Sequence, residues 1–310
     1  MRNFDYSLLR ERTFDREVIN YIGLIHEFKG RQQLYLEQKP QELETLVEIA
    51  KIQSTESSNA IEGIATTKAR LKSLMADKTT PRDRGEKEIK GYRHVLNVIH
   101  ENFDYVPIRK NYILQLHKML YQFVEERFGG NFKDTPNEID MVYPDGRTVL
   151  MFKPLEPFET PEAVEKLCEE YDKAINKYGI DPLIAIPVFI HDFLCIHPFN
   201  DGNGRMSRLL TTLLLYKSGF VIGRYISLEK KIEITKDEYY IALQESSQNW
   251  HEEKNDDTPF IKYILGTIVA AYRDFEERVN MVGKKMSARD MVEKAIRSKI
   301  GKFTKNTSRT

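Results

Sequence analysis

The sequence has little of what marks secreted, membrane or nucleic-acid-binding proteins. Its 310 residues include only two cysteines, Cys168 and Cys195, too few for a disulfide framework. Lysine plus arginine and aspartate plus glutamate are equal at 47 each, so no overall charge attracts nucleic acid or an anionic membrane. No uncharged run approaches the length of a membrane span, and the N-terminus has no signal-peptide core. We therefore expect a soluble cytoplasmic protein with buried free thiols, no membrane partner and no reason to bind nucleic acid.

Strand-like alternation is also scarce, whereas apolar residues recur at helical spacing in segment after segment. This pattern predicts a mainly α fold. The expected helices cover residues 42–64, 86–102, 108–126, 161–178, 182–196, 206–218, 236–247 and 259–281. A polar breaker at 79–85 gives a first boundary. The expected division is an N-terminal helical region (1–85), a core (86–270) and a C-terminal helix with a basic tail (271–310).

One segment, residues 129–157, carries too many glycines and prolines for a helix. Within it, β-favouring residues flank Pro144-Asp145-Gly146, which is a strong turn signal, so we predict a β-hairpin. Its exposed edge over 140–152 would receive an extended target segment by strand addition, and the alternative is a plain surface loop. The expected docking residues are Val142, Val149 and Leu150.

A polar segment, IHPFNDGNGRMSR at residues 196–208, lies between two nearly all-apolar helical stretches. Gly202 and Gly204 at a helix start place successive backbone N–H groups where they can converge on a phosphate. Asp201 offers a hard oxygen ligand for Mg²⁺, which commonly bridges nucleotide phosphates. His197 can titrate near neutral pH, so it is the candidate general base.

Two arginines, Arg205 and Arg208, follow three residues apart and can hold further phosphate oxygens. Each element alone has a structural explanation, because a lone histidine, a glycine turn and surface arginines are common. Packing does not explain a base, a metal ligand, an anion-binding loop and two arginines within the twelve residues 197–208. The segment therefore predicts a site for nucleotide phosphates.

These twelve residues match the complete signature of the Fic family, His-Pro-Phe-x-Asp-Gly-Asn-Gly-Arg-x-x-Arg, and the chain resembles that family more loosely over 86–270. The resemblance implies a helical core with a β-hairpin flap. It also implies a protein adenylyltransferase that moves AMP from ATP to a hydroxyl of a target protein, and of itself, with Mg²⁺ as cofactor. One departure is Lys153-Pro154, where the family usually has paired prolines.

The resemblance further implies a role for each signature residue. His197 would deprotonate the target hydroxyl, and Asp201 would bind Mg²⁺ on the α- and β-phosphates. Tyr239 and Tyr240 would wall the adenine, with ordinary core packing as the alternative. The phosphates would be held, from α to γ, by Gly202, Asn203 and Gly204, then by Arg205, then by Arg208.

A second motif, Ser58-x-x-x-Glu62-Gly63, resembles the inhibitory helix motif of the same family. By itself it would be read as a polar helix end with a glycine stop. Together with the signature, it implies that Glu62 pairs with Arg208 and occupies the place of the γ-phosphate. The sequence thus predicts an autoinhibited enzyme.

Three alternatives stay open at this point. The same site could remove AMP from modified proteins, with Glu62 aligning a water. His191-Asp192 with His197 could form the metal cluster of an HD-type phosphohydrolase, although the further ligands that such a site needs are missing. The chain could also be a non-catalytic module that binds nucleotide. The sequence leaves open the target, its residue type (Ser, Thr or Tyr), what relieves inhibition, a homodimer, and whether the tail continues into a winged-helix module.

Overall fold

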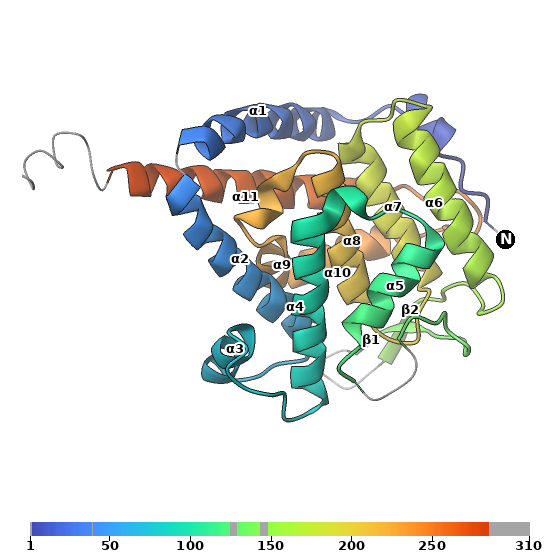
Figure 1. Ribbon diagram of the computed structural model, residues 1–310. Coiled ribbons are helices and arrows are strands. Elements are labelled where there is room, and N and C mark those ends of the chain that lie inside the picture. The colour runs from blue at the N-terminus through green and yellow to red at the C-terminus, as the bar shows by residue number, and fades with distance from the viewer. Residues whose placement is uncertain (1, 39, 125–128, 143–147, 285–310) are drawn as a thin grey trace, which may run out of the picture.

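The computed structural model of the protein describes residues 2–38, 40–124, 129–142 and 148–284 (Figure 1). These residues form eleven α-helices, three short 3₁₀ helices and one two-stranded sheet, so the prediction of a mainly α fold is confirmed. The elements of the first half are η1 (Tyr6–Arg10), α1 (Arg16–Gln38), α2 (Pro40–Ile61), α3 (Lys68–Met75), α4 (Arg84–Asn102), η2 (Phe103–Tyr105), α5 (Lys110–Leu120), β1 (Ile139–Val142) and β2 (Thr148–Phe152). Those of the second half are α6 (Thr160–Asn176), α7 (Pro182–Ile196), α8 (Asn203–Lys217), η3 (Val221–Arg224), α9 (Leu228–Ile234), α10 (Lys236–Ser247) and α11 (Thr258–Lys284).

Helix α7 begins and ends where the sequence predicts, because its start signals are local. The Asp181 side chain accepts a hydrogen bond from Leu183 N at 2.8 Å, and Pro182 occupies the first helical position. Helix α10 also matches its predicted bounds. Three helices were not predicted: the long α1, and α3 and α9, which have only 8 and 7 residues and hence too few turns to show a period.

Helices α7 and α8 form the centre of the molecule, and nearly all their side chains are buried. Helix α7 packs against α6, α8, α10 and α11, whereas α8 also contacts α4 and α2. Along one edge, α1 and α11 run side by side, and α2 descends from them toward α4 (Figure 1). The connection between α7 and α8 holds the polar segment, which therefore lies between two buried helices.

The predicted hairpin is present, with β1 antiparallel to β2 and Met141 opposite Val149. Its predicted turn, residues 144–146, lies outside the described residues. At the base of the hairpin, the Phe152 ring stacks on His251 at 5.3 Å and meets Trp250 edge-on at 5.8 Å. These contacts fix the second strand to the segment that follows α10.

One continuous hydrophobic core extends from Phe4 to Val279 across the predicted boundary at residue 85, and the division into three regions stays a prediction. The tail 285–310 lies outside the described residues. Cys168 and Cys195 are both buried and free, as predicted. Among the described helices, none is both long and apolar enough to cross a membrane.

Candidate active site

His197 terminates α7 in a conformation that presents one ring nitrogen. Its backbone lies in the left-handed region, with φ of 50°, and its N–H closes the helix on Phe193 O at 3.0 Å. The ring Nδ1 lies 3.2 Å from Leu194 O, so Nδ1 carries the hydrogen and Nε2 keeps its lone pair. Burial lowers the pKa of His197 to about 4, which leaves the imidazole neutral at pH 7. The residue is therefore in the state that a general base requires.

The loop from His197 to α8 is closed by the side chain of Asn203. Its Oδ1 accepts from Phe199 N at 2.9 Å, and its Nδ2 donates to Phe199 O at 2.7 Å. The predicted contact of Asn203 with the α-phosphate stays a prediction. In the structure, the side chain makes these two hydrogen bonds to the backbone of Phe199. Gly202 caps the helix with φ of 83°, and a Cβ there would lie 2.9 Å from Tyr121 Oη. The first N–H groups of α8 have no partner within the helix, as at any helix start, and can bind an anion.

Arg205 faces the interior and not the open side of the loop. It is 1% exposed, forms an ion pair with Glu88 on α4, and donates to Tyr121 Oη at 2.7 Å. It also lies 3.4 Å from Asp201 Oδ1, while Arg84 reaches Asp201 Oδ2 at 3.3 Å. The predicted β-phosphate contact of Arg205 remains a prediction; in this structure its guanidinium fixes the loop against α4 and α5.

Arg208 is directed toward a different element, the C-terminal end of α2. Its Nε donates to Ser58 Oγ at 2.8 Å, and its Nη2 donates to Ser58 O at 2.9 Å and to Glu62 Oε1 at 2.7 Å. Gly63, with φ of 77°, ends the helix just after Glu62. A Cβ at position 204 would collide with Glu62 Oε1, so the carboxylate lies directly over the first turn of α8. A negative group thus occupies the place where a helix start attracts anions.

The site opens into a cavity of about 550 Å³, a volume typical of small-molecule sites. The cavity brings together segments that are far apart in the chain. Of the predicted residues, it is lined by Glu62, His197, Gly204, Arg208, Tyr239 and Tyr240. The hairpin adds Glu138, Ile139, Met151 and Phe152 to its wall. Leu150 is 52% exposed on the hairpin, whereas the side chains of Val142 and Val149 lie outside the described part.

His117 was missed as a site residue and holds the loop from below. Its ring stacks on Phe199 at a centroid distance of 3.7 Å and an interplanar angle of 2°. Nδ1 accepts from Gly130 N at 2.9 Å, which leaves Nε2–H to donate to Asp201 O at 3.0 Å. Burial lowers the pKa of His117 to about 4. Its position on a helix face shared with Leu116 and Leu120 was the one signal that the sequence offered.

Lys133 was also missed and clamps the end of α7. Its Nζ donates to Ile196 O at 3.0 Å and to Asn137 Oδ1 at 2.9 Å, and its backbone N–H donates to Pro198 O at 2.9 Å. Burial lowers the pKa of Lys133 to about 8. Asn137 Nδ2 in turn donates to Phe199 O at 3.1 Å. No local pattern in the sequence marks these contacts, because both residues lie in irregular chain.

His117 should make the protein sensitive to acid. Its folded pKa of about 4 lies below the unfolded value of 6.5, so its contribution is complete above pH 6.5 and is lost as pH falls toward 4. The loss is about 2 to 3 kcal/mol by pH 4.5. We expect the free energy of urea unfolding to fall more between pH 7.5 and 4.5 in the wild type than in His117→Gln. An equal fall in both proteins would contradict this assignment.

The HD-type reading finds no cluster to support it. His191 binds Asp257 and Ser247, whereas Asp192 accepts from Trp250 Nε1 at 2.7 Å and from Tyr6 Oη at 2.8 Å. Across residues 2–38, 40–124, 129–142 and 148–284, no three or more His, Cys, Asp or Glu side chains gather where they could hold a metal ion.

Comparisons with known proteins place the chain in a family. The sequence profile described as Fic/DOC family matches residues 107–215. The chain is 31% identical over 122 residues to a Fido domain-containing protein of Dictyostelium discoideum, covering 80% of that protein and 38% of this chain. It is 26% identical over 152 residues to the protein adenylyltransferase fic-1 of Caenorhabditis elegans, which is 49% of this chain but only 25% of that longer protein.

The crystal structure of a Fic family protein from Desulfovibrio desulfuricans G20 has the same fold, with a TM-score of 0.69 and 22% sequence identity. The similarity covers 86% of this chain and 76% of that one. The chain belongs to the Fic/DOC family.

Proposed function

We propose that the protein transfers AMP from ATP to a hydroxyl of a target protein, and of itself, and that Glu62 inhibits the transfer. The observation that carries the proposal is that His197, Gly204 at the start of α8, and Arg208 line one cavity. The neutral imidazole takes the hydroxyl proton, the oxygen attacks the α-phosphorus, and pyrophosphate leaves. Backbone N–H groups of α8 stabilise the charge that builds on the phosphate oxygens.

The residues present also fit a Mg²⁺ ion. Mg²⁺ is usually held by one or two carboxylates together with substrate phosphates and waters, so a single carboxylate at the helix start is sufficient. The Asp201 side chain is 47% exposed and is paired with the guanidinium groups of Arg84 and Arg205. This carboxylate thus already binds positively charged groups. When bound, the ion would neutralise phosphate charge. Asp201 would hold it.

The hairpin is the proposed docking edge for the target. Met151 and Phe152 of β2 line the cavity that contains His197, so a peptide added along the hairpin would pass close to the base. The partners of the protein are then ATP and a protein that presents a hydroxyl.

Leu150 gives a test of this docking edge. Its large apolar side chain is 52% exposed on β2, and docking would bury it. We expect Leu150→Ser to raise the KM for the target protein about tenfold while the Kd for ATP stays constant, since burying a leucine contributes about 1.5 to 3 kcal/mol. Leu8→Ser, at a position that is 64% exposed on η1, is the matched control. A parallel loss of ATP binding, or no change in KM, would argue against docking here.

Inhibition by Glu62 is proposed because Arg208 is already engaged in hydrogen bonds to Ser58 and Glu62. This arginine is 4% exposed, and it donates to Ser58 near the end of α2 and to Glu62 just after it. Lys236 Nζ donates to Ile61 O at 2.8 Å and so holds the end of the same helix. While α2 keeps this position, the guanidinium and the helix start that would bind phosphates face the Glu62 carboxylate.

The buried face of α2 is polar over residues 54–59, between the buried apolar residues Ala50 and Ile61. The side chain of Ser54 donates to Glu229 Oε2 at 2.6 Å, and that of Ser57 donates to Glu233 Oε2 at 2.7 Å. Thr55 Oγ1 and Asn59 Oδ1 are buried without a hydrogen-bond partner in the described structure. Hydrogen bonds, more than apolar area, therefore position this part of the helix.

Position-specific labelling of ATP tests the proposed reaction. AMP transfer places label from the α-phosphate on protein, whereas label from the γ-phosphate leaves with pyrophosphate. We expect only the α-label to be retained when the Glu62→Gly variant is incubated with a lysate. Retention of the γ-label would indicate phosphorylation, and retention of neither with ATP bound would favour the non-catalytic module.

Removal of AMP is a second candidate, favoured by one observation. The Glu62 carboxylate and the His197 ring line the same cavity, where the carboxylate could align a water. Protein carrying the AMP label is then the substrate to use. If removal dominates, wild type releases AMP and Glu62→Gly does not.

A further inference from the structure

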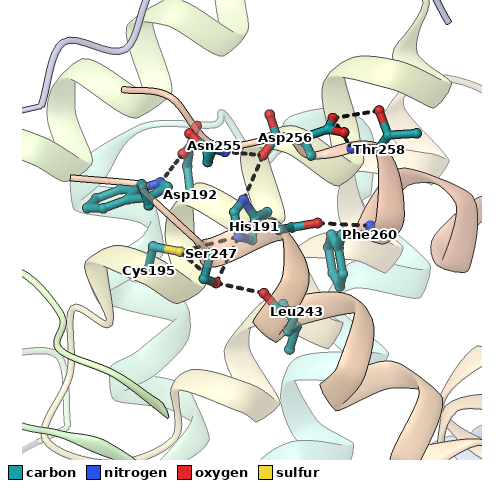
Figure 2. A network of polar contacts seen from close by, with 12 residues as sticks. His191, Asp192, Cys195, Leu243, Ser247, Asn255, Asp256, Thr258 and Phe260 are labelled. Atoms are coloured by element: carbon teal, nitrogen blue, oxygen red, sulfur yellow. Dashed lines mark hydrogen bonds and ion pairs between the residues drawn. The ribbon is translucent and has the colours of Figure 1, made fainter. Parts of the chain in front are cut away.

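A polar cluster that the proposed transfer does not use lies around His191 (Figure 2). Cys195 Sγ is 3.4 Å from His191 Nε2, and His191 Nδ1 is 2.8 Å from Asp257 Oδ1. The imidazole is fully buried. Thiol, imidazole and carboxylate thus follow one another in the order nucleophile, base and orienting group.

The carboxylate of Asp257 fixes the tautomer of His191. Asp257 Oδ1 also accepts from Asn255 Nδ2 at 2.8 Å, and Oδ2 is paired with Arg12 Nη1 at 3.3 Å. The carboxylate accepts the hydrogen of Nδ1, so in the neutral ring the lone pair lies on Nε2, which faces Cys195.

Ser247 does not compete for that lone pair. Its Oγ lies 3.1 Å from His191 Nε2, but its hydrogen is donated to Leu243 O at 2.7 Å (Figure 2). The S–H of Cys195 is then the donor to Nε2. If the proton moves to the ring, the resulting N–H has two acceptors, the thiolate and Ser247 Oγ.

The electrostatics of the cluster favour a proton on His191. Burial alone lowers the pKa of His191, but the charges of Cys195 and Asp257 and their hydrogen bonds outweigh it and raise that pKa well above 6.5. An N–H on Nε2, 3.4 Å from Cys195 Sγ, would stabilise negative charge that develops on the sulfur as it reacts.

Cys195 lies at the cavity wall. Cys195 and Ser247 line the same cavity of about 550 Å³ as His197, Tyr239 and Tyr240, whereas His191 does not line it. Since Cys195 is only 2% exposed, reagents must be small.

We propose that Cys195 is a modification site, an activated thiol that peroxides and other small electrophiles reach through this cavity. The thiolate attacks one peroxide oxygen, an S–O bond forms and the O–O bond breaks. Sulfur is oxidised to a sulfenic acid, and the departing hydroxide takes the His191 proton and leaves as water. The modified sulfur projects into the space proposed for ATP, so nucleotide and reagent exclude each other. Only this exclusion rests on the proposed function.

Cys168 provides an internal control for the experiment. It is 4% exposed on α6, and burial raises its pKa to about 12. The folded full chain is treated with iodoacetamide or with hydrogen peroxide followed by a sulfenic-acid probe, and each cysteine peptide is quantified by mass spectrometry. We expect Cys195 to react at least tenfold faster than Cys168 in the wild type. His191→Gln should lose that advantage.

Equal rates at the two cysteines, or an undiminished rate at Cys195 in a folded His191→Gln protein, would overturn the proposal. If His191→Gln does not fold, the proposal is tested with Asp257→Asn and with the comparison of the two cysteines in the wild type. Loss of the orienting carboxylate must also slow the reaction of Cys195. ATP is added in a separate arm and should slow Cys195 and not Cys168. If Cys195 is labelled fast and ATP does not slow the labelling, the activated thiol is supported. That result would instead contradict the proposed position of the nucleotide.

Discussion

His197→Ala is expected to lower AMP transfer by roughly 10² to 10⁴-fold while ATP binding is retained. The imidazole is the proposed base, and it is neutral at pH 7, since Nδ1–H is held by Leu194 O and burial lowers the pKa of His197 to about 4. Its removal leaves Arg208 and the start of α8 in place. The measurement is single-turnover labelling with α-labelled ATP in the Glu62→Gly background, alongside a titration of nucleotide affinity.

The matched control is His251→Ala, which removes a histidine outside the cavity lining at the base of the hairpin. Its transfer rate should fall far less than that of His197→Ala. Near wild-type transfer by His197→Ala would refute the role of this residue as base. A joint loss of transfer and ATP affinity would instead show that the side chain acts in binding.

Glu62→Gly is expected to raise AMP transfer about thirty-fold. In the wild type, a γ-phosphate near Arg208 would meet the Glu62 carboxylate, which now lies 2.7 Å from Arg208 Nη2. Two like charges about 4 Å apart repel by about 4 kcal/mol at an effective dielectric of 20, and half of that value corresponds to about thirty-fold in the population of the reactive pose. Self-modification and lysate labelling at equal protein concentration measure the change.

Two further variants separate charge from shape. Glu62→Gln keeps a hydrogen-bond acceptor for Arg208 without the charge and should be activated nearly as much as the glycine variant. Ser58→Ala removes the hydroxyl that binds Arg208 Nε at 2.8 Å but keeps the carboxylate, so we expect weaker activation. Unchanged or reduced labelling by Glu62→Gly, with Tm preserved, would exclude inhibition and favour a role in aligning water.

The sequence predicts what is encoded locally. The bounds of α7 follow from the Asp181 cap and the proline at its first position, and those of α10 match the helical period of its apolar residues. The pair Glu62–Arg208 is separated by 146 residues and was expected only through the family resemblance, because no local pattern joins the two motifs.

Contacts that support the loop from outside could not be predicted. Glu88 meets Arg205 across 117 residues, and Lys133 meets Ile196 across 63. Such contacts depend on how the helices pack. The sequence alone does not show which charged residues will be buried. His117 was visible only as a polar residue on an apolar face, a pattern that fits a satisfied core histidine equally well.

The buried polar residues at 54–59 of α2 bear on how the enzyme would be controlled. An exchanged hydrogen bond contributes only about 1 kcal/mol net, because water offers a substitute, and a buried polar atom without a partner opposes docking by about 1 to 3 kcal/mol. The unpartnered Thr55 Oγ1 and Asn59 Oδ1 therefore work against the bonds made by Ser54 and Ser57. These opposing terms largely cancel at residues 54–59, so the proposed inhibitory position would depend mainly on the bonds that Arg208 and Lys236 make with the end of the helix. A partner that binds those two cations would then shift it.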